Sequence, residues 1–177
     1  MRVRTTALVC TAVLAAATAC ADPGPGASSA GPGAAPASGP TWAVGDAAAV
    51  TKRLLATGLP VKLTATYSGA DDPDGLLGRP RQYTSKAAFD DTRVSNSPLA
   101  KEEAAGHRRD AVSYGGAVEV FAAPEDAEAR AGDLAGRPQS TGGGARPDYV
   151  YRSGVVVVRV SHLLTPEQAQ AYARAVG

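Results

Sequence analysis

Cysteine and histidine are both scarce in this chain of 177 residues, which contains two of each. The cysteines, Cys10 and Cys20, both lie within the first twenty residues. The rest of the chain therefore cannot contain a disulfide, a zinc–thiolate site or a cysteine nucleophile. Its fold must depend on a buried core without help from disulfides.

The two histidines, His107 and His162, give no pattern that indicates a catalytic site. Ser161 precedes His162, but neighbours in sequence do not face one another, and no third member of a triad is evident. His107 lies in the charged segment 91–112, which we interpret as a solvated loop. The sequence indicates no metal site and no cofactor.

A large excess of charge of either sign is also absent. The chain has 18 basic and 17 acidic residues, and two of the basic ones, Arg2 and Arg4, lie in a segment that we expect to be removed. A nearly neutral domain lacks the basic surface that binds nucleic acid. Hydrophobic residues make up 44% and charged residues 20%, which excludes a wholly disordered chain.

The N-terminus has the pattern of a signal peptide, predicted at residues 1–19. Arg2 and Arg4 give it a positive start, and an apolar run follows at residues 5–19. As a helix this run would be about 22 Å long, too short for a hydrocarbon core of about 30 Å. No charged stop-transfer segment follows, so we interpret the run as an export signal rather than a membrane span.

Cys20 closes this segment and is the predicted site of lipid attachment. The sequence LAAATACA at residues 14–21 resembles the bacterial lipobox, although Ala17 replaces the commoner Leu or Val. The resemblance implies that the Cys20 thiol receives a diacylglycerol and becomes the mature N-terminus, with two acyl chains for stable anchoring. The alternative is cleavage by ordinary signal peptidase at an Ala-x-Ala site, residues 17–19.

Residues 21–40 are predicted to form a disordered tether that begins next to the lipidated cysteine. The segment is rich in Ala, Gly, Pro and Ser and has no apolar residue larger than Ala. It cannot bury enough surface to offset the entropy cost of ordering. As a flexible coil it would span on the order of 25 Å and hold the domain at the extracytoplasmic face of the cell membrane.

Residues 41–177 are predicted to form one α+β domain. Adjacent strands with short links favour a mainly antiparallel sheet of about five strands, in two layers with the helices on one face. Gly115 and Gly116 predict a bulge or a close backbone approach, and the valine run 155–158 predicts a central strand covered on both faces. The predicted order α-β-β-β-α-β-β-α comprises residues 46–57, 61–67, 83–89, 114–121, 124–134, 149–151, 155–160 and a helix that begins at the capping box 165–168.

The acidic run at residues 71–75 has some likeness to a calcium-binding loop. An EF-hand loop would require an acidic residue at position 70 and a glutamate at position 81, where this sequence has Ala70 and Arg81. We therefore interpret the run as a turn formed by Asp, Pro and Gly.

The following segment, DGLLGRPRQYTSK at residues 74–86, is the one stretch for which we predict a binding surface. It combines two leucines with arginines and a tyrosine, the aromatic and guanidinium types that are enriched where surfaces bind partners. The alternative is structural, with the leucines packed against the end of the sheet and Arg79 paired with Asp72 or Asp74. The predicted surface residues are Asp74, Leu76, Leu77, Arg79, Arg81 and Tyr83.

The same segment resembles a family of uncharacterised membrane lipoproteins from actinomycetes and related Gram-positive bacteria. Three motifs carry the likeness: DPDGLLGRPRQYTSK at residues 72–86, GGAVEVF at 115–121 and LTPEQAQAY at 164–172. The likeness spans most of residues 60–175, but Asp74 replaces the family's usual Asn, and the segment 91–112 is longer and more charged. The resemblance implies lipoprotein status and a shared fold, and it implies no activity.

Together these features predict an exported, lipid-anchored envelope protein. We expect its domain to be a non-enzymatic module that binds an unknown protein, wall polymer or small ligand, and no nucleic acid. The alternatives are a hydrolase or transferase that acts on cell-wall material, and a protein-binding module like a β-lactamase inhibitor, which rests on fold analogy alone.

Replacing Cys20 with Ser should abolish lipid attachment, because serine has no thiol to receive the diacylglycerol. We expect Cys20→Ser protein to accumulate as unprocessed precursor or as a soluble secreted form, as measured by membrane fractionation and metabolic labelling with palmitate. Cys10→Ser serves as the control and should remain lipidated. A correctly processed, membrane-retained Cys20→Ser protein would contradict the assignment.

Overall fold

The computed structural model describes residues 45–105, 111–137 and 146–177. The predicted signal peptide, Cys20 and the tether lie outside these residues, as does His107. Within the described part of the chain, no helix is long and apolar enough to cross a membrane.

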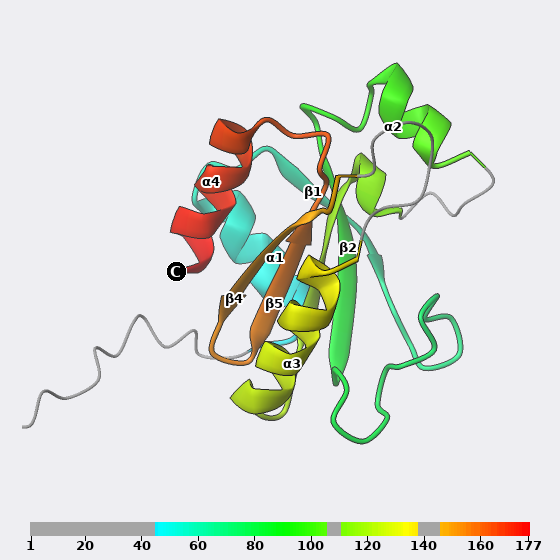
Figure 1. Cartoon of the computed structure of the whole chain (residues 1–177), viewed down its shortest axis with the longest axis vertical. Helices are drawn as coiled ribbons and strands as arrows, with labels where there is room; N and C mark the ends of the chain where they lie inside the picture. The colour runs from blue at the N-terminus through cyan, green and yellow to red at the C-terminus, as the bar shows by residue number, and fades with distance from the viewer. Residues whose placement is uncertain (1–44, 106–110, 138–145) are drawn as a thin grey trace, which may run out of the picture. The chain divides into compact units, whose positions relative to one another are not determined.

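Five strands form one antiparallel sheet, which confirms the predicted α+β class (Figure 1). The sheet order is β1-β2-β3-β5-β4, and each neighbouring pair is antiparallel. The valine-rich strand is interior, between β3 and β4, while β3 occupies the middle of the sheet. The strands are β1 (Val61–Thr66), β2 (Ser85–Asp91), β3 (Gly115–Val120), β4 (Tyr149–Ser153) and β5 (Val156–Val160).

The helices begin at the capping signals in the sequence. Asp46 accepts a hydrogen bond from the backbone N–H of Ala49 at 2.8 Å, and Thr165 forms the predicted capping box with Gln168. The described residues contain α1 (Ala47–Ala56), α2 (Pro98–Glu103), α3 (Pro124–Ala135), α4 (Pro166–Val176) and a 3₁₀ turn at Val112–Tyr114.

The prediction that the helices pack on one face of the sheet is wrong. α1 and α4 cover one face, whereas α3 lies across β4 and β5 on the other (Figure 1). The valines of β5 explain this arrangement, because Val156, Val158 and Val160 face the first core and Val157 faces the second, among side chains of α3. An interior strand that is apolar on both sides requires a covering layer on each side.

The segment at residues 91–112 is not a loop throughout, although residues 106–110, which include His107, lie outside the described part of the chain. This segment contains α2, which Ser97 caps by accepting a hydrogen bond from the N–H of Ala100 at 3.1 Å. Ala100 and Ala104 are buried, Lys101 and Glu102 are exposed, and Glu103 is half-buried. The signal in the sequence was Ser97 followed by Pro98, a cap and a first-turn proline, but it opens a helix of only six residues.

Gly115 and Gly116 mark a close approach of neighbouring strands, as the sequence predicted. A Cβ atom on Gly115 would overlap the backbone of Asp91, and one on Gly116 would overlap the carbonyl of Arg159 and the ring of Phe89. Only glycine fits here, and this allows β3 to lie closely between its two partner strands.

Changing Val157 to Asp should remove most of the stability of the domain. Val157 is fully buried against α3, so the substitution would place an unpaired carboxylate in an apolar environment. We expect a loss of several kcal/mol, comparable to the total stability of a domain of this size. Urea unfolding measures it, with the exposed Thr64→Asp on β1 as the control. A Val157→Asp protein as stable as the control would contradict the burial of this position.

Candidate functional site

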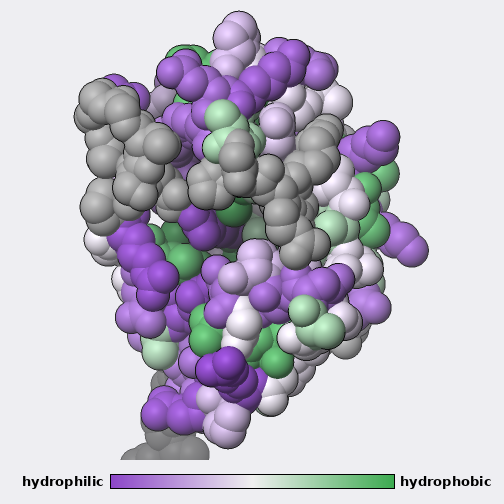
Figure 2. Space-filling model, turned by 90° about the vertical axis from the view of Figure 1, so that its right-hand side faces the viewer, coloured by the Kyte–Doolittle hydropathy of each residue, from purple (hydrophilic) through white to green (hydrophobic). Residues whose placement is uncertain are grey.

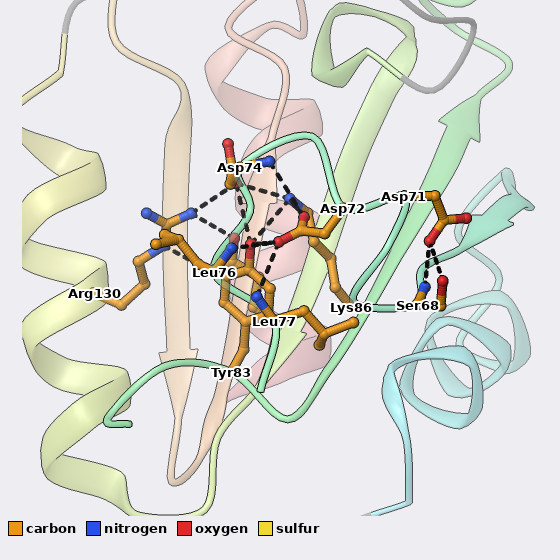
Figure 3. Close-up of polar contacts among 10 residues, drawn as sticks. Ser68, Asp71, Asp72, Asp74, Leu76, Leu77, Tyr83, Lys86 and Arg130 are labelled. Carbon is orange, nitrogen blue, oxygen red and sulfur yellow. Dashed lines mark hydrogen bonds and ion pairs between the residues drawn. The ribbon is translucent and has the colours of Figure 1, made fainter. Parts of the chain in front are cut away.

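The segment between β1 and β2 (residues 67–84, the β1–β2 loop) is held by one buried carboxylate. The side chain of Asp72 is 0% exposed. Its Oδ2 atom accepts hydrogen bonds from the backbone N–H groups of Leu76 and Leu77 at 2.8 and 3.0 Å and from the Tyr83 hydroxyl at 2.7 Å (Figure 3). Its Oδ1 atom accepts a hydrogen bond from Lys86 Nζ at 2.9 Å. Asp72 thus connects both halves of the loop to β2.

Two further carboxylates, the buried Glu119 and the partly exposed Asp74, and the buried Arg130 complete a set of paired charges. Arg130 of α3 donates to both oxygens of Glu119, at 2.8 and 2.7 Å, in the bidentate geometry that favours this pair. Arg130 also donates to Asp74 Oδ2 at 3.1 Å, and Lys86 donates to the same atom at 2.7 Å. We call this set the Asp72 network; it comprises Asp72, Asp74, Lys86, Glu119, Arg130 and the hydroxyl of Tyr83.

The network lies on the sheet face that α3 covers. Lys86 of β2 and Glu119 of β3 are register partners, and both are buried. The rings of Tyr67 and Tyr83 flank the Lys86 ammonium, each with its centroid 5.2 Å from Nζ. Beside these charges, Leu76 and Leu77 pack against the second core, which contains Phe121 and Val157. The β1–β2 loop therefore adds to the layer that α3 forms on this face.

Hydrogen bonds determine the charge state of the two aspartates. Burial alone would raise the pKa of Asp72, but hydrogen bonds from Lys86, Tyr83 and the loop backbone hold that pKa well below its ordinary value. Burial likewise opposes ionisation of Asp74, but the hydrogen bond and charge of Lys86, with the charge of Arg130, lower its pKa. Burial and the bond to Asp72 raise the pKa of Tyr83, so its hydroxyl remains a neutral donor.

The structure separates the six predicted surface residues into three groups: one buried, two partly buried and three exposed. Tyr83 is fully buried, so the prediction that it lies on the surface is wrong; its hydroxyl is needed inside the network. Leu76 and Leu77 are partly buried, and the side chain of Asp74 is 40% exposed. Arg79 and Arg81 are exposed. The surface that the loop offers to a partner is therefore centred on its two arginines.

The structural role expected for Arg79 is filled by other cations. Lys86 and Arg130, rather than Arg79, pair with the aspartates, and the sequence analysis identified neither of them. A signal for Arg130 was present, since it lies three residues after Ala127 and four before Leu134, on the buried stripe of α3. Lys86 gave no such signal, because a lysine in a strand is ordinarily exposed to solvent.

A second polar cluster joins α2 to the beginning of β4 and the end of β5. The His162 ring nitrogens lie 3.0 Å from Asp148 Oδ1 and 3.0 Å from Glu103 Oε1, and Asp148 also accepts from Arg159 at 2.7 Å. The neighbouring Ser161 hydroxyl donates to the carbonyl of Ser113 at 3.4 Å. Among the described residues, no group of three His, Cys, Asp or Glu side chains could hold a metal ion.

No family model, no curated protein and no solved structure matches this chain. The likeness of residues 60–175 to Gram-positive lipoproteins therefore stays a prediction from its three motifs. Any function must be inferred from the sequence and from the contacts, burial and charge of the described residues.

Changing Asp72 to Asn should destabilise the domain by about 3 kcal/mol, because removing one partner of a buried ion pair leaves the other uncompensated. It should also reduce acid sensitivity. The pKa of Asp72 lies below its ordinary value of 3.8, so this carboxylate stabilises the fold above about pH 4, and its contribution is lost as pH falls further. Urea unfolding between pH 7 and pH 2 measures both effects. The exposed Asp133→Asn on α3 should match the wild type, and an Asp72→Asn protein that also matches it would show that the network does not hold the loop.

Proposed function

We propose that the chain is an exported lipoprotein, anchored through Cys20 at the extracytoplasmic face of the cell membrane, whose domain binds a ligand without chemical turnover. The anchor rests on the lipobox-like sequence at residues 14–21 and on the apolar run before it. The tether at residues 21–40 would separate the domain from the bilayer, within reach of cell-wall polymers and neighbouring proteins.

The observation that carries the binding role is the pre-organised β1–β2 loop. Besides the bonds to Asp72, four backbone hydrogen bonds of 2.9 to 3.0 Å lie within residues 72–83. Gly75 and Gly78 adopt positive φ angles of 63° and 77°, which permit its tight turns. A loop that is already ordered loses little entropy when it binds, so it can present a fixed recognition surface.

The backbone of Arg81, in the same loop, has a strained conformation. It is the one non-glycine residue in the described part of the chain with a positive φ angle, 60°. This conformation costs an L-residue roughly 1–2 kcal/mol. Such strain persists only where the surrounding structure enforces it, and it is concentrated at binding and catalytic sites. A tight turn enforces it here: the N–H of Gln82 donates to the carbonyl of Arg79 at 3.0 Å, and Pro80 precedes Arg81 in this turn.

The chemistry of the exposed tip favours an anionic ligand. The Arg79 side chain has no hydrogen bond or ion pair among the described residues, and Arg81 uses its Nε atom to contact Asp126 at 2.9 Å. Guanidinium groups bind phosphate and carboxylate through paired N–H donors. The loop lies on the right of Figure 1, and hydrophilic residues predominate on that side in Figure 2. A phosphate-bearing or carboxylate-bearing wall polymer, or an acidic protein surface, fits this loop.

Replacing both Arg79 and Arg81 with Ala should reduce retention of the protein by purified cell walls about tenfold, with little change in melting temperature. Both side chains are exposed, so their loss removes ligand contacts rather than core packing. Co-sedimentation at low and high salt measures binding, and capture of partners from intact cells identifies protein ligands.

The matched control replaces Arg137 and Arg174, two other exposed arginines, with Ala. This control has the same total charge as the loop variant. It should bind like the wild type, because Arg137 and Arg174 lie outside the β1–β2 loop. If the Arg79/Arg81 variant binds as well as the control in both assays, the loop is a structural element and its assignment as a ligand-binding surface is wrong.

A further inference from the structure

The amine of Lys86 and the carboxyl group of Asp72 form a buried pair whose two groups can also react with each other. Their side chains are 6% and 0% exposed, and Lys86 Nζ lies 2.9 Å from Asp72 Oδ1. An amine and a carboxyl group that are held together away from water have a high effective concentration for condensation. We propose that the folded chain joins Lys86 and Asp72 through a side-chain amide, an intramolecular isopeptide bond.

The two oxygens of Asp72 have different environments, as amide formation requires. Oδ2 accepts hydrogen bonds from two backbone N–H groups, those of Leu76 and Leu77, and from the Tyr83 hydroxyl. Three donors on one oxygen form an oxyanion-hole arrangement that stabilises the negative charge of a tetrahedral intermediate. Oδ1 accepts one longer backbone hydrogen bond, from the N–H of Asp74 at 3.3 Å, and lies next to the Lys86 amine; it is the oxygen that leaves. The hydrogen bonds thus define which oxygen is retained.

Asp74 is placed to move the protons. Its Oδ2 atom lies 2.7 Å from Lys86 Nζ, within the range for direct proton transfer, and the Tyr83 hydroxyl lies 3.4 Å from the same oxygen (Figure 3). The side chain of Asp74 is 40% exposed, so it connects the buried pair to solvent and gives the released water a way out. On the inner side, the rings of Tyr67 and Tyr83 shield the lysine.

The reaction balances without an oxidant, a reductant or a co-substrate. Asp74 takes one proton from the Lys86 ammonium and passes it to Oδ1 of Asp72, which gives a neutral amine and a neutral carboxylic acid. The amine nitrogen then attacks the side-chain carboxyl carbon of Asp72, which forms the N–C bond and moves an electron pair onto Oδ2. Collapse of this intermediate breaks the bond from carbon to Oδ1. That oxygen departs as water with two hydrogens from Lys86, delivered through Asp74. One ammonium and one carboxylate thus become one amide and one water.

The product would leave the polar groups of the network satisfied. The amide oxygen keeps its three donors, and the amide N–H donates to Asp74 in place of the ammonium. Because hydrogen bonds hold the pKa of Asp72 low, the ion pair is the resting state before reaction. The bond therefore forms slowly, by way of the minor neutral pair, once the loop has folded.

Mass spectrometry of the full-length chain tests this bond. The folded protein is incubated and then denatured. We expect the measured mass of the wild type to be lower than the mass calculated from its sequence by one water molecule. Fragmentation should place the link between Asp72 and Lys86, and trypsin should fail to cleave after Lys86. Lys86→Arg keeps the cation but cannot form the amide, so it should have its full mass. Lys62→Arg, an exposed lysine on β1, is the matched control and should lose the water as the wild type does.

Asp74→Asn tests the proton transfer separately, because it keeps the size of the side chain but removes the base. We expect it to lose water about a hundredfold more slowly than the wild type. A wild-type protein that retains its full mass after prolonged incubation, or a loss of water located elsewhere in the chain, overturns the proposal. Loss of water from Asp74→Asn at the wild-type rate overturns the role of Asp74.

Discussion

A carboxylate with no access to solvent must replace its hydration with hydrogen bonds, and Asp72 does so with donors from three parts of the chain. Three come from the loop backbone, one from Tyr83 and one from Lys86 of β2. Breaking any of these contacts would leave a buried charge short of a partner, which costs more than the contact itself contributes. The conformation of the β1–β2 loop therefore depends on this one side chain.

Buried charges of this kind stabilise a fold less than apolar packing of equal volume would, but they specify one arrangement. Asp72, Asp74 and Glu119 face Lys86 and Arg130, and no buried side-chain N or O atom in the described ranges lacks a hydrogen-bond partner. A slipped register between β2 and β3 would separate these partners. The network thus fixes the strand register on a face where α3 packs only near β4 and β5.

The sequence predicted the elements whose signals are local, and it failed where distant residues decide. Alternation, the capping box at Thr165 and the glycines of β3 predicted the strands and the last helix correctly. The valine run predicted that β5 is covered on both faces, but the helix that covers the second face was not assigned to it, because no local pattern assigns a helix to a face. Lys86 and Arg130 were missed because a charged residue is ordinarily exposed, and only the assembled fold supplies their carboxylates. Tyr83 was assigned to the surface because aromatic side chains are enriched at binding surfaces, and only the assembled fold shows that its hydroxyl is buried against Asp72.

The strand order also determines when the domain can first become stable as the chain is made. β3 pairs with β5 rather than with β4, so the middle of the sheet lacks one neighbour until residue 160 is available. Before that point, Phe89 and Val118 have no valine strand beside them and no α4 above them. Non-local pairing of this type delays folding, because chain closure must precede the stabilising contacts. Until β5 has been made, the middle strand of the sheet therefore has one open edge, and the first core cannot be completed.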